Sequence, residues 1–263
     1  MNLIVANDDG IGEPGIWALA RELSPLGSVA VYAPTRNFSG AGMSVTLRRE
    51  LRLSRAAVPP GIDPACAAFT LDAPPASLAA IGTAHAFGGK VDALVAGINP
   101  GWNLCEAPFK VSGTAGAAQV AVERGLLGVA VSAGETAAAR QYADIAAATR
   151  RLVQAIRGAF DPLPAVLLNV NVPETFGPDT EVRLTRPSRD PTFSEFGLHE
   201  YAADEQGINL RVRLGDFFGR QPRPGDEMHA LAEGAVSIAV TGRYPSDVWQ
   251  YEPWTSIVRE FRA

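Results

Sequence analysis

Two adjacent carboxylates stand at the end of an apolar run near the start of the chain. Leu3-Ile4-Val5-Ala6 is typical of a buried strand, and Asn7-Asp8-Asp9-Gly10 follows it directly. α/β enzymes place their chemistry at such strand ends. Neighbouring side chains on a strand point to opposite faces, so Asp8 and Asp9 can share a cation only if the chain turns there, and Gly10 permits that turn. The pattern predicts a metal site, and the alternative is a polar turn that caps the following helix.

Two further segments favour a phosphate site beside these carboxylates. The apolar run 29–34 leads into 35–44, a loop of small residues whose backbone amides can approach an anion closely. The run 93–96 ends in Gly97-Ile98-Asn99-Pro100-Gly101-Trp102-Asn103, and Ser112-Gly113-Thr114 then opens an alanine-rich stretch. Hydroxyls and free amides at the start of a helix suit phosphate oxygens. These segments predict a phosphate pocket.

Taken in chain order, these motifs resemble the SurE family of metal-dependent 5'/3'-nucleotidases, also called survival protein E. The matching segments are Asn7-Asp8-Asp9-Gly10 with Pro14-Gly15, Ala33-Pro34, Arg36-Asn37 with Ser39-Gly40-Ala41, Ser44-Val45-Thr46, Gly97-Ile98-Asn99 with Gly101 and Asn103, and Ser112-Gly113-Thr114. Weaker similarity continues in Asn169-Val170-Asn171-Val172-Pro173, at Asp226 and in Gly234-Ala235-Val236-Ser237-Ile238. The resemblance therefore covers most of the chain.

The resemblance implies an activity and a set of site residues. The expected reaction is hydrolysis of nucleoside 5'- and 3'-monophosphates to nucleoside and phosphate, with Asp8 and Asp9 as catalytic residues. One divalent cation per subunit is expected on Asp8, Asp9, Ser39 and Asn99, and these hard oxygen ligands suit Mg²⁺ or Mn²⁺. The phosphate pocket is expected to comprise Asn37, Gly40, Asn103, Ser112, Gly113 and Thr114. One aspartate is expected to orient the attacking water, and we favour Asp9.

The chain also departs from the family pattern at three places. Thr35 stands where an acidic residue is usual, and Pro74-Pro75-Ala76-Ser77 lacks a carboxylate that the family carries. The segment 104–111 differs in sequence and is longer by one residue. These differences put the substrate preference in question. They also leave open a second hypothesis, a catalytically weak or inactive nucleotide-binding or regulatory member of the same fold.

Apolar runs of strand length alternate with helix-like segments along the chain. The expected strands are Leu3 to Ala6, Val29 to Ala33, Ala93 to Ala96, Gly128 to Ser132 and Val166 to Val172. A short helix is expected at Ile16 to Leu23 and an amphipathic helix at Thr136 to Phe160. This order predicts an α/β fold with an open, mostly parallel, Rossmann-like three-layer sheet. Alternating residues from about Val182 to Gly215 predict an antiparallel β excursion. Residues 1–243 form the expected domain, and 244–263 an extended C-terminal tail.

Composition agrees with a globular enzyme but does not identify one, and it argues against a general nucleic-acid-binding surface. The 263 residues are 47% hydrophobic, with a formal net charge of -5, so a nucleotide would have to be held in a local site. Cys66 and Cys105 have no metal-ligand spacing, and reduced thiols are expected, although the sequence leaves a disulfide between them open. The absence of a signal-like or membrane-length apolar segment predicts a cytoplasmic protein with no membrane partner.

Other enzyme classes lack their motifs. Phe38-Ser39-Gly40 is no Gly-x-Ser-x-Gly elbow for a serine hydrolase, and no Gly-x-Gly-x-x-Gly follows the first strand. The three histidines, His85, His199 and His229, lie outside the motifs.

Two groups of aromatic residues have open roles. Phe38, Trp102 and Phe109 can stack on a base or pack inward. Trp249, Tyr251, Trp254 and Phe261 can pack on their own subunit or be exchanged between subunits. Because the family assembles through extended C-terminal elements, a homodimer or homotetramer is expected.

Overall fold

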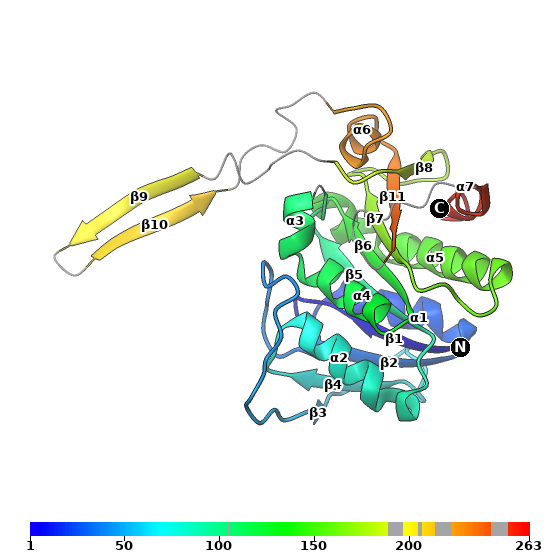
Figure 1. Ribbon diagram of the computed structural model, residues 1–263, viewed down its shortest axis with the longest axis horizontal. Helices are drawn as coiled ribbons and strands as arrows, with labels where there is room; N and C mark the ends of the chain where they lie inside the picture. Colours follow the sequence, from blue (N-terminus) through cyan, green and yellow to red (C-terminus); the bar gives the residue numbers. More distant parts are fainter. Residues whose placement is uncertain (105, 189–196, 205–206, 214–221, 243–251) are drawn as a thin grey trace.

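A computed structural model of the chain has one large mixed sheet and a separate hairpin (Figure 1). It describes residues 1–104, 106–188, 197–204, 207–213, 222–242 and 252–263. The strands of the large sheet, in spatial order, are β3 (Ser54–Arg55), β4 (Ala67–Leu71), β2 (Ser28–Pro34), β1 (Asn2–Ala6), β5 (Ala93–Pro100), β6 (Leu127–Ala133), β7 (Leu167–Val172), β11 (Val236–Thr241) and β8 (Val182–Thr185). The five strands expected from the apolar runs are all present in this sheet.

Six neighbouring strands, from β4 to β7, run parallel, so their carboxyl ends share one edge of the sheet. The chain leaves β1 toward β2 on one side, and later returns to place β5 on the other side of β1. Strand order therefore reverses between β1 and β5. Open α/β sheets bind ligands at this kind of reversal, outside the carboxyl ends of the strands.

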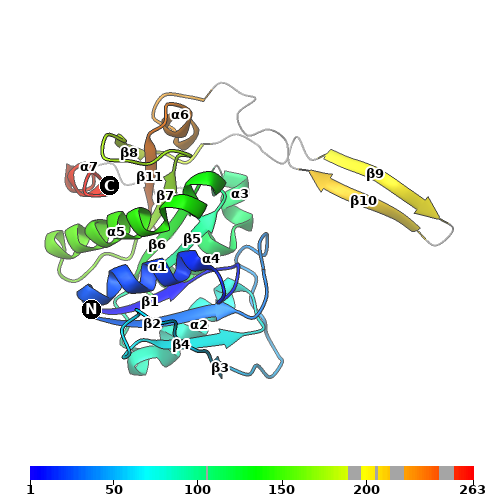
Figure 2. The same ribbon diagram turned by 180° about the vertical axis from the view of Figure 1, so that it is seen from behind.

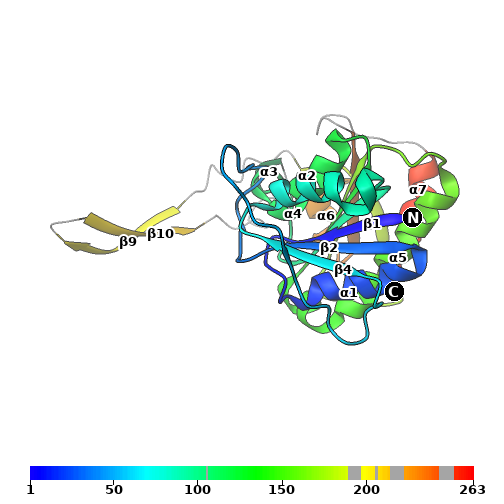
Figure 3. The same ribbon diagram turned by 90° about the horizontal axis from the view of Figure 1, so that it is seen from below.

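Helices cover both faces of the sheet, giving the expected three layers (Figure 3). On one face lie α1 (Pro14–Leu23) and α5 (Glu135–Ala159), and on the other α2 (Pro75–His85) and α4 (Gly113–Glu123). Strand side chains alternate between the two cores: Leu3 and Val5 join the α1/α5 core, whereas Ile4 joins the α2/α4 core. The remaining helices are α3 (Glu106–Val111), α6 (Glu227–Ala232) and α7 (Glu252–Val258).

The long helix α5 confirms the amphipathic helix expected at Thr136 to Phe160. Its apolar stripe includes Ile145 and Leu152, which are both fully buried. The helix is kinked at Gln141, whose backbone angles (φ -127°, ψ 22°) are not helical. The Gln141 side chain donates to the carbonyl of Phe176 and accepts from its backbone amide, so the kink is tied to the loop that follows β7.

The antiparallel excursion is the hairpin of β9 (Gly197–Asp204) and β10 (Gly207–Arg213), which projects from the body of the molecule (Figures 1 and 2). The expected excursion began near Val182, but β8, which starts there, belongs to the large sheet and runs parallel to β11. The expected start was therefore wrong, because a four-residue strand carries too short a pattern to reveal its partner. Most of the described residues of the excursion form the hairpin.

At the C-terminus, the described aromatic residues pack on their own chain. Trp254 stacks on Phe160 with ring centroids 5.2 Å apart, and Phe261 lies 5.8 Å from the ring of Phe176. Both are buried. Trp249 and Tyr251 lie outside the described residues.

Two further observations concern the cysteines and the hydrophobicity of the helices. The Cys66 thiol is buried and free, whereas Cys105 falls outside the described residues. In the ranges given above, no helix combines the length and apolarity needed to cross a bilayer.

The packing of α7 leads to a stability prediction. Trp254→Ala removes a fully buried ring that stacks on Phe160, so the free energy of unfolding should fall by about 3–5 kcal/mol. Ser256→Ala, at an exposed position of the same helix, is the control and should change it by less than about 0.5 kcal/mol. Urea unfolding measures both, and equal effects would contradict the packing of Trp254 described here.

Candidate active site

The loop after β1 turns as the two aspartates require. The Asn7 side chain closes the turn, because its amide nitrogen donates to the Gly10 carbonyl (2.7 Å) and its amide oxygen accepts from the Gly10 amide (3.2 Å). Gly10 has φ +120°, a conformation that other residues rarely adopt. This closed turn presents Asp8 and Asp9 at the carboxyl edge of the sheet, beside the reversal between β1 and β5.

Asp8 lies against the start of α4. The residue is only 4% exposed, and its Oδ1 accepts a hydrogen bond from the Thr114 hydroxyl at 2.6 Å. A Cβ atom placed on Gly113 would lie 2.6 Å from the Cβ of Asp8 and 2.7 Å from its Oδ2. Glycine at position 113 therefore allows α4 to begin in direct contact with Asp8.

Asp9 is held by the loop that follows β2. Its Oδ1 accepts from the Asn37 amide nitrogen at 2.7 Å and from the Ser39 hydroxyl at 3.4 Å. The Asn37 amide oxygen accepts from the Ser39 backbone amide, and the Phe38 amide donates to the Asp8 carbonyl, both at 2.7 Å. These bonds join the loops after β1 and β2.

Burial and like charge act on both carboxylates. Burial raises the pKa of Asp8 above its ordinary value, against the opposing effect of the Thr114 hydrogen bond. The pKa of Asp9 is raised to about 6, first by burial and then by the negative charges of Asp8 and Glu13, while Asn37 and Ser39 oppose the rise. Two carboxylates thus lie close together in a partly dehydrated place, an arrangement that disfavours two negative charges.

Asn99 and Ser112 occupy the neighbouring parts of this edge. Asn99 lies at the end of β5, the strand next to β1, and its amide nitrogen donates to the Gly101 carbonyl at 2.6 Å. Its amide oxygen is the atom that is left to bind a cation. The Ser112 hydroxyl caps α4 by accepting from the Ala115 amide at 3.0 Å, so its proton stays available to a ligand.

Asn103 is set in a buried polar network. Its side-chain nitrogen donates to the Ser132 hydroxyl at 2.7 Å, and its backbone amide donates to the Asn171 side chain at 2.9 Å. The Asn169 amide nitrogen donates to the Asn103 carbonyl (2.8 Å) and to the carboxylate of the buried Glu227 (2.9 Å). Asn103 is thus rigidly placed, with its side-chain nitrogen engaged by Ser132.

The structure brings most of the expected site residues to one edge, and direct contacts join several of them. Asp8 meets Gly113 and Thr114, and Asp9 meets Asn37 and Ser39. Gly40 lies exposed in the same loop with φ +81°. Asn37 and Thr114, which were expected to bind phosphate, each donate to an aspartate, so they also orient the carboxylates.

The donor set suits a hard divalent cation. Neither Asp8 nor Asp9 has an ion pair with a basic side chain of the described residues, so none of those residues is a counterion for them. No three His, Cys, Asp or Glu side chains gather in a metal-binding group among these same residues. A cation here would therefore need neutral oxygens to complete its shell, and Ser39 and Asn99 carry such oxygens.

Sequence reasoning missed several residues around this site. Glu13 and Tyr142 lie close enough to Asp9 for charge effects, since Glu13 raises the pKa of Asp9, and burial, Glu13 and Asp9 raise the pKa of Tyr142. Ser132 and Glu227 support Asn103. Ser132 ends an apolar run, which is a usable signal, but no local signal connects Glu227 or Tyr142 to the motifs.

Comparisons with known proteins point to one family. The family described as "Survival protein SurE" matches residues 3–192. The 5'-nucleotidase SurE of Gloeobacter violaceus is 33% identical over 90% of this chain and 88% of its own length. That of Dehalococcoides mccartyi (strain 195) is 35% identical over 91% and 88%. The crystal structure of the Aquifex aeolicus SurE protein superposes with a TM-score of 0.74, at 27% identity over 93% of this chain and 94% of its own.

The family match spans more than half of the chain, and the relatives align along nearly its whole length. The aspartates, the loop after β2 and the start of α4 all lie within the matched residues. The protein belongs to the SurE family.

Proposed function

We propose that this protein is a metal-dependent phosphomonoesterase that hydrolyses nucleoside 5'-monophosphates, and also 3'-monophosphates, to nucleoside and phosphate. The nucleotide as substrate is supported by relatives that are named 5'-nucleotidases. The metal dependence and the 3' activity rest on the chemistry of the site and on the resemblance to the family. Assembly into a homodimer or homotetramer is part of the same proposal.

One observation carries the proposal: two neighbouring carboxylates, with no ion pair to any described basic side chain, lie at the start of α4, and Asp8 touches it. Gly113 and Thr114 of α4 touch Asp8, so an anion bound at the helix start would lie beside two negative charges. Repulsion would expel a phosphate from that position unless a cation lay between them. Mg²⁺ or Mn²⁺ on Asp8, Asp9, Ser39 and Asn99 meets this requirement. When bound, the ion polarises the phosphoryl oxygens and makes a water molecule more acidic.

The residues around the site are assigned to position the carboxylates, to activate the attacking water and to bind the phosphate. Thr114 fixes the rotamer of Asp8, and Asn37 occupies one oxygen of Asp9. The second Asp9 oxygen is the group we assign to orient the attacking water and take its proton. The water oxygen then bonds to phosphorus, the phosphorus–oxygen ester bond breaks, and the departing nucleoside oxygen takes up a proton. We assign the Gly40 amide, the Ser112 hydroxyl and the first amides of α4 to hold the phosphate oxygens, because Ser112 caps the start of that helix.

The first prediction concerns the carboxylates. Asp8→Asn and Asp9→Asn should each lower phosphate release from adenosine 5'-monophosphate by at least about a hundredfold, because each replaces a negatively charged ligand of the cation with a neutral one. Asp144→Asn, at an exposed position of α5, is the matched control and should keep wild-type turnover. The assay is run with Mg²⁺ or Mn²⁺, and again with chelator, which should abolish turnover. Near-normal turnover of both aspartate variants, or full turnover in chelator, would refute the proposal.

A second prediction separates phosphate from metal. Ser112→Ala should weaken binding of inorganic phosphate more than binding of Mn²⁺, since the hydroxyl is assigned to the phosphate. The same change removes the cap of α4, at a cost of about 1 kcal/mol of stability. Ser112→Thr keeps a hydroxyl at the cap and serves as control. Calorimetric titration with phosphate and with Mn²⁺ measures both affinities. An equal loss of affinity for the two ligands would show that the Ser112 hydroxyl is not specific to the phosphate.

The third prediction concerns the close approach of α4. Gly113→Ala places a methyl group 2.6 Å from the Asp8 Cβ, so Asp8 or α4 must move, and turnover should fall by at least about tenfold. Gly158→Ala is the control, because a methyl group there meets no atom within 4 Å. Initial rates and thermal unfolding are compared for the two variants. Wild-type rates in Gly113→Ala would mean that contact between Asp8 and α4 is not needed.

A further inference from the structure

An arginine lies over an aromatic ring at the rim of the site. The Arg36 guanidinium carbon is 4.2 Å from the centroid of the Phe38 ring. The neighbouring residues of this segment, Asn37 and Ser39, both bond to Asp9, and the Phe38 amide bonds to the Asp8 carbonyl. Arg36 and Phe38 therefore form a cation–π pair, which we call the rim stack, on the same loop whose side chains bond to Asp9.

The aromatic residues with open roles can now be told apart. Trp102 packs against Leu104, Met228 and Leu231, and its ring nitrogen donates to the Val172 carbonyl at 2.6 Å. Phe109 packs against the α2/α4 core. Phe38 is half-buried and belongs to no apolar cluster formed by the described residues. Among the three aromatics considered for base stacking, Phe38 is the one whose ring is covered by a polar side chain and not by a core.

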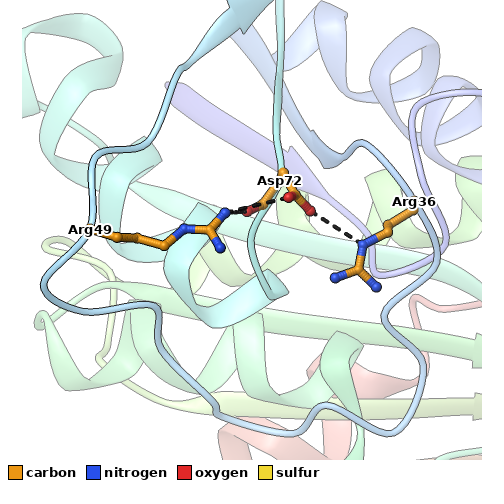
Figure 4. A network of polar contacts seen from close by, with 3 residues as sticks. All are labelled: Arg36, Arg49 and Asp72. Atoms are coloured by element: carbon orange, nitrogen blue, oxygen red, sulfur yellow. Dashed lines mark hydrogen bonds and ion pairs between the residues drawn. The ribbon is translucent and has the colours of Figure 1, made fainter.

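A shared carboxylate holds the arginine in place (Figure 4). Asp72 lies between two guanidinium groups, with Oδ1 3.3 Å from Arg36 Nε and Oδ2 3.4 Å from Arg49 Nη2. Arg49 also donates to the Asp72 carbonyl at 3.1 Å. The Arg36 side chain remains 67% exposed. The guanidinium group thus lies over the Phe38 ring and its Nε contacts Asp72, while much of the side chain stays open to solvent.

We propose that the rim stack binds the nucleobase of the substrate, with the exposed face of the Arg36 guanidinium lying on the planar ring. The proposal rests on the proposed function, because a phosphate held at the aspartates places its nucleoside near the loop that holds them. Bases stack on both aromatic rings and arginine planes, and such stacking tolerates different bases. In this arrangement the Phe38 ring contacts one side of the Arg36 guanidinium group, and the ion pair with Asp72 restricts the rotation of the Arg36 side chain.

A second anionic group of the ligand is the competing occupant. Arg36 and Arg49 share one carboxylate, so the trio carries a net positive charge. Both arginines would contribute to attraction of an anion, whereas only Arg36 lies on Phe38. The two possibilities therefore differ in what Arg49 does, and in whether a lysine can replace Arg36, since lysine keeps the charge and loses the plane.

The test compares a substrate that has a base with one that lacks it. For the wild-type protein and each variant, kcat/KM is measured for adenosine 5'-monophosphate and for ribose 5-phosphate. Phe38→Leu, Arg36→Gln and Arg36→Lys should each lower the ratio of the first value to the second by about tenfold. Arg49→Gln, the matched control with the same carboxylate partner, should leave the ratio as in the wild type. Circular dichroism checks that each variant folds. If Phe38→Leu does not fold, the two variants of the exposed Arg36 test the proposal on their own.

Adenosine binding gives a second readout that does not depend on hydrolysis. Calorimetry should detect adenosine binding to the wild type and to Arg49→Gln, and a tenfold weaker affinity in the Arg36 and Phe38 variants. If the wild type cleaves neither ester, the nucleotidase proposal fails and adenosine binding alone decides on the rim stack. An unchanged ratio and affinity in the Arg36 variants, equal losses in Arg49→Gln, or rescue by Arg36→Lys would overturn the base-binding assignment.

Discussion

The organisation of this site follows from the repulsion between two neighbouring carboxylates that are partly removed from water. Asp8 is nearly buried and Asp9 lies next to it, and in the described part of the chain no basic side chain pairs with either. The fold keeps them together by hydrogen bonds to neutral donors, Thr114 on one and Asn37 and Ser39 on the other. Neutral donors hold the carboxylates in position without neutralising their negative charge, so that charge remains available to bind a cation. An arginine or lysine in the same place would have neutralised it.

The sheet topology brings these donors to the carboxylates. Asp8 follows β1, Asn37 follows β2 and Thr114 lies in the first turn of α4, yet the parallel strands β2, β1 and β5 end at one edge and α4 begins there. The reversal of strand order at β1 opens the space that a ligand needs. A single missing side chain, at Gly113, then lets the helix start approach Asp8 closely. The proposed nucleotidase chemistry and the proposed base site on Arg36 and Phe38 both depend on the loops at this edge.

Local patterns in the sequence were sufficient for much of this architecture. The apolar run before Asp8 predicted β1, Ser112-Gly113-Thr114 predicted the start of α4, and the spacing of Ile145 and Leu152 predicted α5. Contacts between distant residues were not predictable in this way. Nothing near Thr114 indicates that its hydroxyl bonds to Asp8, 106 residues earlier, and nothing near Glu227 indicates its bond to Asn169. The kink at Gln141 likewise depends on Phe176, which belongs to another loop.

We propose that phosphate binds beside Asp8 and Asp9 only when a cation lies between them. Calorimetric titration of inorganic phosphate into the wild-type protein, once with saturating Mn²⁺ and once with chelator, tests it without reference to any substrate. We expect measurable phosphate binding with Mn²⁺ and a loss of at least about a hundredfold in affinity without it. Equal phosphate affinity under the two conditions would contradict it.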